Sequence, residues 1–251
     1  MTKREEERER KNGEEFLNSD QHRTGLVVVA AGNSRRMGEG IRKPYLPLGP
    51  HPLLIHTLRA FQETQELTKK VLVIHPEERE RTEKLLLKYG IDDYELAVGG
   101  ELRQESVQRG LSLLGDGVEY VLIHDGARPF VSPSLLRRIL NQVWLRGAVI
   151  PVIPVLDTVK KVDAEGRVIH SVDRELLRAA QTPQAFSLPL LKEVMEKVAK
   201  TGEIYTDEAS MMESMGIPVY TVEGEKINFK ITTPEDLLVA EAWVKERWGN
   251  S

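Results

Sequence analysis

The chain has 251 residues, of which 40% are hydrophobic and 29% are charged, enough for one large domain or two small ones with a core that needs no covalent staples. It contains no cysteine, which excludes disulfides and thiolate metal sites and predicts a cytoplasmic protein. The net charge is −4, and no apolar run approaches the ~20 residues of a bilayer-spanning helix, so we expect neither nucleic acid nor membrane as a partner.

The first 24 residues form a charged extension. They mix both charge signs, contain almost no apolar side chains and lack the apolar stretch of a signal peptide. Such a segment buries too little apolar surface to order itself, so we expect residues 1–24 to be disordered. A partner-binding arm is the alternative interpretation. The folded domain is expected over residues 25–251.

Strand and helix patterns alternate along the rest of the chain. Short β-branched runs predict strands at 26–30, 70–75, 94–98, 119–124 and 148–155. Between them, apolar residues with helical spacing predict helices within 52–61 and 131–144. The pairs Ser132-Pro133 and Thr233-Pro234 each read as an N-cap followed by proline at the first helical position. The pattern predicts an α/β, Rossmann-like fold, a mostly parallel twisted sheet with helices on both faces.

One stretch departs from this alternation. Residues 154–175 read as two polar strands joined by a turn at "DAEG", residues 163–166. We interpret the segment, about 155–175, as a β-arm projecting from the main sheet, and an ordinary edge hairpin is the alternative. Such arms leave unpaired strand edges, which a second subunit often covers.

The loop after the first strand combines small residues with positive charge. In "LVVVAAGNSRRMGEG", Ala30, Ala31 and Gly32 leave the backbone open to a flat base or a phosphate. The cations that follow are Arg35, Arg36 and Lys43. The loop matches neither G-x-x-x-x-G-K-[ST] nor G-x-G-x-x-G, which excludes a P-loop and the dinucleotide fingerprint. A plain turn with surface arginines stays open as an alternative.

A second candidate site follows a later strand, in "IHDGARPFV" at 123–131. Ligands of open parallel sheets bind beyond the carboxyl ends of the strands, so Asp125 should face the same crevice as the first loop. Its carboxylate could there help to hold Mg²⁺, and Arg128 lies beside it. We interpret His124 as structural.

Two further segments carry chemistry-bearing residues. In "GGELRQESVQRG" at 99–110, two glycines precede a predicted helix bearing Glu101, Arg103 and Ser106. In "KINFKITTPEDL" at 226–237, Lys230 is predicted to lie in a short strand before a capped helix. Lys230 matters for function only if that strand enters the crevice.

Nine motifs in order resemble one known family. They are "VVVAAGNSRRMG", "KPYLPLG", "HTLRAF", "VGGELRQESV", "IHDGARP", "DTVKKV", "LLRAAQTPQAF", "YTDEASMMESMGIPVYTVEG" and "NFKITTPEDL". Together they resemble the 2-C-methyl-D-erythritol 4-phosphate cytidylyltransferases of the nonmevalonate isoprenoid pathway, across essentially everything after residue 24. The sister ribitol-5-phosphate cytidylyltransferases share most of these motifs, and "DTVKKV" favours the first family.

The resemblance implies a nucleotidyltransferase fold and a reaction in which the phosphate of methylerythritol phosphate attacks the α-phosphorus of CTP and pyrophosphate leaves, with Mg²⁺ or another divalent cation as cofactor. It implies roles by motif. Arg36 and Lys43 would stabilise charge on the α-phosphate, and Arg174 and Lys230 would position the sugar phosphate. Contacts to CTP are implied for Ala30, Ala31, Gly32, Gly100, Ser106, Asp125 and Arg128, and contacts to the second substrate for Thr158 and Thr182. In this family the arm reaches into a neighbouring subunit, which implies a homodimer.

The chain departs from the family pattern at three places. It has Ser34 where glycine is usual, Arg42-Lys43-Pro44 where Pro-Lys-Gln is usual, and Glu101 where aspartate follows the paired glycines. Two other hypotheses remain beside the leading one. These are a ribitol-5-phosphate cytidylyltransferase and a noncatalytic nucleotide-binding protein on the same fold. An NAD-dependent oxidoreductase is disfavoured because the glycine fingerprint is missing.

Overall fold

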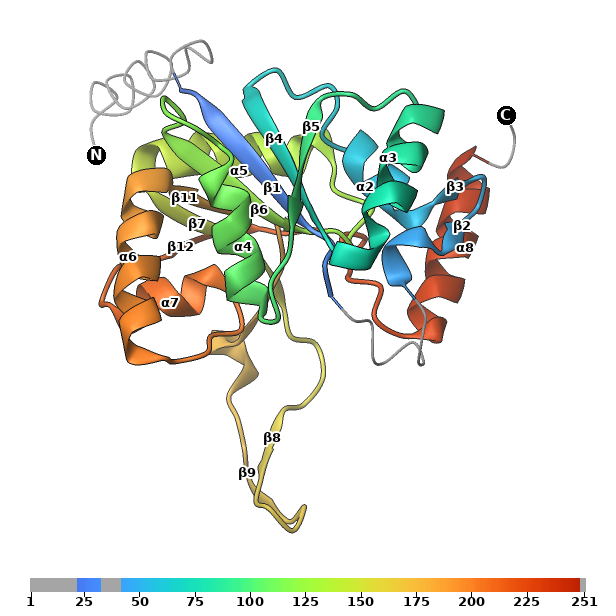
Figure 1. The fold of residues 1–251 in the computed structure, drawn as a ribbon. Helices are drawn as coiled ribbons and strands as arrows, with labels where there is room; N and C mark the ends of the chain where they lie inside the picture. The colour runs from blue at the N-terminus through green and yellow to red at the C-terminus, as the bar shows by residue number, and fades with distance from the viewer. Residues whose placement is uncertain (1–21, 33–41, 249–251) are drawn as a thin grey trace, which may run out of the picture.

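A mostly parallel β-sheet forms the centre of the molecule in the computed structural model, which describes residues 22–32 and 42–248 (Figure 1). Within these residues the sheet has eight strands, in the order β10-β7-β11-β6-β1-β4-β5, with β12 paired to β7. Five strands confirm the predicted ones, and their bounds are β1 Thr24–Val29, β4 Leu67–Ile74, β5 Tyr94–Val98, β6 Tyr120–Asp125 and β7 Ala148–Pro154.

The sheet is apolar on both faces because helices cover both. Val27 and Val28, neighbours on β1, have no exposed surface although they point to opposite sides. Val28 packs in a cluster with α2, α3 and α5, and Val27 packs in a second cluster with α4, α6 and α7. The helices are α2 Leu53–Arg59, α3 Arg79–Lys88, α4 Arg103–Ser112, α5 Pro133–Arg146, α6 Leu188–Thr201 and α7 Glu208–Ser214. The doubly covered α/β architecture is therefore as predicted.

The predicted helix signals are confirmed in α5 and in α8 (Pro234–Trp248). The Ser132 hydroxyl accepts a hydrogen bond from the Leu135 amide at 3.0 Å, and Pro133 follows it. The Thr233 hydroxyl accepts one from the Asp236 amide at 3.3 Å. Each cap satisfies a backbone donor that the first helical turn leaves free. Helix α8 packs against the short strand β2 (Pro47–Leu48), which pairs with β3 (His51–Pro52), in a third apolar cluster.

The chain changes direction across the sheet between β1 and β6. From β1 it proceeds to β4 and β5 on one side, and then crosses to β6 on the other side. Strands β1, β4, β5 and β6 are parallel, so their carboxyl ends share one edge. The loops after β1 and β6 are joined by a hydrogen bond from the Gly126 amide to the Val29 carbonyl at 2.9 Å. Such a switch point leaves a crevice where ligands bind.

The predicted β-arm is confirmed, and it projects from the body of the molecule (Figure 1). Strands β8 (Lys160–Val162) and β9 (Val168–Ser171) form a separate two-stranded sheet. At its tip, an Asp163 carboxylate oxygen accepts from the Arg167 amide at 2.8 Å, and Gly166 takes a φ of 81° that glycine adopts without strain. Apolar side chains on this hairpin, such as Val168, are exposed.

Two sequence expectations about local structure are wrong. Lys230 does not lie in a strand, because the Ile231 amide bonds to the Ala127 carbonyl in the loop after β6 instead of joining a sheet ladder. Helix α4 begins at Arg103, so Glu101 precedes the helix. Several elements after the arm were not predicted: β10 Arg178–Ala180, β11 Gln184–Ser187, β12 Tyr220–Glu223, α6 and α7. Within the described ranges, no helix has the length and apolar content to cross a membrane.

Candidate active site

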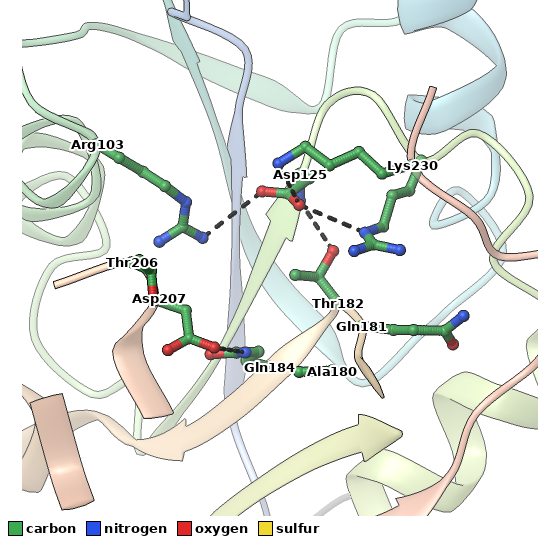
Figure 2. A pocket seen from close by; sticks show the side chains of 10 residues that line it. Arg103, Asp125, Ala180, Gln181, Thr182, Gln184, Thr206, Asp207 and Lys230 are labelled. Atoms are coloured by element: carbon green, nitrogen blue, oxygen red, sulfur yellow. Dashed lines mark hydrogen bonds and ion pairs between the residues drawn. The ribbon is translucent and has the colours of Figure 1, made fainter. Parts of the chain in front are cut away.

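Two adjoining hollows lie at the carboxyl edge of the sheet. The larger has a volume of about 1030 Å³ and the smaller about 170 Å³. Arg103, Asp125 and Lys230 line both, so they form the boundary between them. The larger hollow also contains Ala30, Ala31, Gly32, Lys43, Gly99, Gly100, Ser106 and Gly126. The smaller one also contains Arg128, Ala180, Gln181, Thr182, Gln184, Thr206 and Asp207 (Figure 2).

Small residues let two loops meet closely at the larger hollow. A Cβ on Gly99 would lie 2.3 Å from the Cβ of Ala31 and 2.9 Å from Oγ of Ser106, so only glycine fits there. Ser106, buried in α4, accepts a hydrogen bond from the Gly100 amide at 3.1 Å and donates to the Leu102 carbonyl at 3.2 Å. The paired glycines are therefore held against the end of β1, and the backbone surface is open enough for a flat ring.

A cluster of charges surrounds Asp125 at the end of β6. Its Oδ2 lies 3.0 Å from Nζ of Lys230 and 3.4 Å from Nε of Arg128, and its Oδ1 lies 3.6 Å from Nη2 of Arg103. Burial opposes ionisation of Asp125, but Lys230, Arg103 and Arg128 outweigh it and hold the pKa of this carboxyl well below its usual range. Three cations around one carboxylate leave a net positive surface, which suits phosphate groups.

A buried chain of hydrogen bonds through Thr182 and His124 holds the backbone around Asp125 in place. The Thr182 hydroxyl accepts from the Asp125 amide at 3.1 Å and donates to Nδ1 of His124 at 3.0 Å. The other ring nitrogen, Nε2, then donates to the Arg128 carbonyl at 2.9 Å. Burial lowers the pKa of His124 to about 4, so the ring is neutral near pH 7, as this pattern requires. His124 is thus structural, and the Thr182 hydroxyl proton is already used within the protein.

The predicted catalytic lysine reaches the larger hollow from a short 3₁₀ helix, Lys43–Tyr45. Its Nζ donates to the Ile231 carbonyl at 2.9 Å, which holds the ammonium beside the segment that carries Lys230. Pro44 is buried in the first turn of this helix, where its fixed φ is compatible with the backbone. The shifted proline therefore leaves Lys43 at the hollow. Arg36 and Ser34 lie outside the described residues.

Two predicted residues do not reach the hollows within this chain. Thr158 and Arg174 are exposed and line neither hollow. They lie on either side of the arm hairpin, and Nη1 of Arg174 donates to the Leu156 carbonyl. Within a single chain, neither residue is therefore placed against the two hollows.

The described side chains at the two hollows do not form a site that could hold a metal ion by themselves. Among the described residues no group of three or more His, Asp or Glu side chains is placed to bind one. Asp125, which was predicted to help hold Mg²⁺, already faces Lys230, Arg128 and Arg103. A carboxylate so surrounded by cations is a poor ligand for a divalent cation.

Comparison with known proteins agrees with this geometry. The family model described as 2-C-methyl-D-erythritol 4-phosphate cytidylyltransferase matches residues 24–246. The chain belongs to the 2-C-methyl-D-erythritol 4-phosphate cytidylyltransferase family. A member from Geobacillus kaustophilus is 46% identical over 223 residues, covering 88% of this chain and 96% of the relative. One from Bacillus mycoides is 43% identical over 220 residues, covering 87% and 96%.

Solved cytidylyltransferase structures share the fold. The 4-diphosphocytidyl-2C-methyl-D-erythritol synthase of Anaerococcus prevotii superposes with a TM-score of 0.81 at 31% identity, covering 92% of this chain and 99% of the other. The cytidylyltransferase of Thermus thermophilus superposes with a TM-score of 0.73 at 34% identity, covering 87% and 98%. The family recognised from nine sequence motifs is therefore confirmed.

Sequence reasoning about this cytidylyltransferase missed several residues at the site. Arg103 and Gln184 line the smaller hollow, yet neither was assigned a role. Asp207 accepts a hydrogen bond from Nε2 of Gln184 at 2.7 Å and caps α7, and the buried Glu208 follows it. The signal was present in the motifs "VGGELRQESV" and "YTDEAS", but nothing in their spacing shows that the two segments meet.

Proposed function

We propose that this chain transfers CMP from CTP to 2-C-methyl-D-erythritol 4-phosphate, giving 4-diphosphocytidyl-2-C-methyl-D-erythritol and pyrophosphate. One observation carries the proposal: a glycine and alanine backbone surface adjoins a cluster of cations at a single crevice. Nucleotidyl transfer needs this combination, because it depends on positioning and charge neutralisation more than on a covalent nucleophile.

The two hollows suggest where each substrate binds. We assign the nucleotide to the larger hollow, with its base against Gly99, Gly100 and Ala31 and its phosphates toward Lys43. The sugar phosphate then occupies the smaller hollow, beside Arg128 and Thr182. The boundary residues lie where the two phosphates would meet.

The chemistry at that boundary requires no general base. A phosphate oxygen of the second substrate, already an anion, forms a new bond to the α-phosphorus of CTP, and the bond from that phosphorus to the bridging oxygen of pyrophosphate breaks. Lys43 and Lys230 both line the larger hollow and supply positive charge near the reacting centre, and Asp125 holds Lys230 at 3.0 Å. Cations placed in advance stabilise the charge that develops in the transition state.

We propose that the divalent cation binds together with the nucleotide. Mg²⁺ bound to the CTP phosphates neutralises charge and orients the triphosphate. The described side chains favour this over a metal held by Asp125, since Asp125 faces three cations. The cytoplasmic location stays a prediction, as does the disorder of the charged extension, although its last residue, Thr24, is buried at the start of β1.

We further propose that the active enzyme is a homodimer in which each arm completes the partner's site. The support is that the arm projects (Figure 1) and exposes apolar residues such as Ile169, while Thr158 and Arg174 line neither hollow of their own chain. Subunit mixing tests this. If the arm acts across subunits, mixing inactive Lys43→Ala and Arg174→Ala variants restores roughly a quarter of the wild-type sites after exchange. No restoration on mixing would contradict a shared site.

The activity itself is tested by product formation. Purified protein with CTP, Mg²⁺ and methylerythritol phosphate should release pyrophosphate and form the cytidine diphosphate product, followed by mass spectrometry. A matched assay with ribitol 5-phosphate should give a much lower kcat/KM. The similarity to relatives named for methylerythritol phosphate favours that substrate. Binding of CTP without turnover by folded protein would instead support the noncatalytic alternative.

A further inference from the structure

A buried ion pair connects the two loops that enclose the site. Glu208, the first residue of α7, has no exposed surface, and its Oε1 accepts a hydrogen bond from Nη1 of Arg103 at 2.6 Å. Arg103 is the first residue of α4, and only Glu101 and Leu102 separate it from the paired glycines of the larger hollow. The pair therefore connects the nucleotide loop to the 206–208 segment at the smaller hollow.

Arg103 is shared between two carboxylates. While Nη1 bonds to Glu208, Nη2 faces Oδ1 of Asp125 at 3.6 Å, and Figure 2 shows the guanidinium directed toward Asp125. The carboxylates of Glu208 and Asp125 both raise the pKa of Arg103, although burial opposes them, so the guanidinium stays charged. A planar guanidinium can bridge two acids in this way, whereas a lysine ammonium acts as a point charge.

The position of Arg103 affects the rest of the cluster. Asp125 uses Oδ2 for Lys230 at 3.0 Å and for Arg128 at 3.4 Å, leaving Oδ1 to Arg103 at the longer distance. Without Glu208, the guanidinium would lose its closest acceptor and could move onto Asp125 or an incoming phosphate. Either movement would disturb the arrangement of cations at the boundary of the hollows.

A contribution to folding stability does not by itself explain the buried ion pair between Arg103 and Glu208. Desolvation of a buried ion pair offsets most of its attraction, so its net contribution to folding is often small. In addition, Oε2 of Glu208 has no hydrogen-bond partner among the described residues, so the carboxylate is only half satisfied. What the pair does provide is a fixed direction for Arg103.

We propose that Glu208 is a positioning residue for CMP transfer, holding the guanidinium of Arg103 at the boundary between the nucleotide and sugar-phosphate hollows so that Asp125 remains with Lys230. This inference rests on the proposed function. Glu208 lines neither hollow, so it acts through Arg103 and touches no substrate.

The decisive variant is Glu208→Gln, which keeps the shape and removes the charge. We expect kcat/KM for the sugar phosphate to fall about tenfold or more, while KM for CTP changes less than about threefold because the glycine surface is untouched. The matched control is Glu213→Gln, an exposed acid on the same helix, which should behave as wild type. Unchanged kinetics in folded Glu208→Gln would overturn the proposal.

A double-variant comparison separates positioning from a purely structural role. If Glu208 acts through Arg103, Arg103→Gln/Glu208→Gln should lose about as much kcat/KM as Arg103→Gln alone, whereas independent roles give losses that multiply. Multiplied losses would refute the positioning role.

A charge-retaining variant covers the case in which Glu208→Gln does not fold. Glu208→Asp keeps the carboxylate but places it on a side chain that is one methylene shorter. We expect this variant to fold and to have partial activity. Wild-type kinetics in Glu208→Asp, or failure of both variants to fold, would assign Glu208 to stability alone and overturn the inference. An inactive wild-type protein would count against the proposed function instead.

Discussion

Replacing Lys43 with alanine should separate catalysis from stability. Lys43 is partly buried at the larger hollow, and its Nζ is fixed by the Ile231 carbonyl at 2.9 Å. Loss of one pre-placed group that stabilises transition-state charge costs about 2.7–4 kcal/mol, which corresponds to a decrease in kcat of about 100- to 1000-fold.

The cost of this substitution in folding is smaller. One hydrogen bond from a charged donor to a carbonyl is lost, which costs about 1.5–3 kcal/mol before discounting for the partial exposure of Lys43. At roughly 2–4 °C per kcal/mol for a chain of this size, Tm should fall by at most about 12 °C. We therefore expect the variant to stay folded at assay temperature, so that a lost rate reports on catalysis.

The assay is continuous pyrophosphate release with saturating CTP, Mg²⁺ and methylerythritol phosphate, fitted for kcat and KM separately. Lys43→Arg keeps the charge and should retain more activity than Lys43→Ala. Lys197→Ala, on the exposed face of α6, serves as the matched control and should be unaffected. A folded Lys43→Ala variant with kcat within about threefold of wild type would refute the assigned role.

The remaining predictions concern the glycine surface and the buried chain of hydrogen bonds. Gly99→Ala places a Cβ 2.3 Å from that of Ala31, so the two loops must separate, and KM for CTP should rise about tenfold or more; an unchanged KM for CTP in the pyrophosphate-release assay would contradict the close approach. Thr182→Val leaves the Asp125 amide and Nδ1 of His124 without their partner, and should lower the free energy of unfolding by about 1–3 kcal/mol in urea titrations; a neutral effect would show that these hydrogen bonds are unimportant. In His124 the folded pKa of about 4 lies below the unfolded value near 6.5, so the unfolded state binds more protons between these values and stability falls as pH falls through them. His124→Gln should remove this decline, worth about 3 kcal/mol, and identical pH profiles for the two proteins would disprove it.

Local sequence patterns were sufficient for much of the fold. The apolar runs of β1 and β6 are long enough to be buried on both faces, and the proline after Ser132 fixes the start of α5. These features depend on neighbours in the chain, so they can be read from spacing alone. The strands around residues 163–166 similarly predicted an arm, because they are polar enough to be exposed.

Local reasoning was less successful after the arm. Strands β10 and β11 are short and pair with β7, far away in the sequence, so neither has a strong pattern of its own. Lys230 follows an apolar residue in a strand-like run, yet its neighbour Ile231 bonds to the loop after β6. Long-range pairing decides such segments, and their own side chains do not encode it.

The sequence by itself determined the fold class through its alternating strand and helix patterns, and the family through its motifs. It also identified many of the residues that line the crevice, because small residues and cations follow the strand ends where parallel sheets bind ligands. Only the tertiary structure decided which charges meet. It places Arg103 between Asp125 and Glu208, leaves the Thr182 hydroxyl engaged with His124, and holds Arg174 away from the hollows of its own chain. Electrostatic interactions depend on the distance between two charges and on their burial. Arg103 and Glu208 are 105 positions apart in the sequence, so they become close and buried only when the folded sheet brings their loops together.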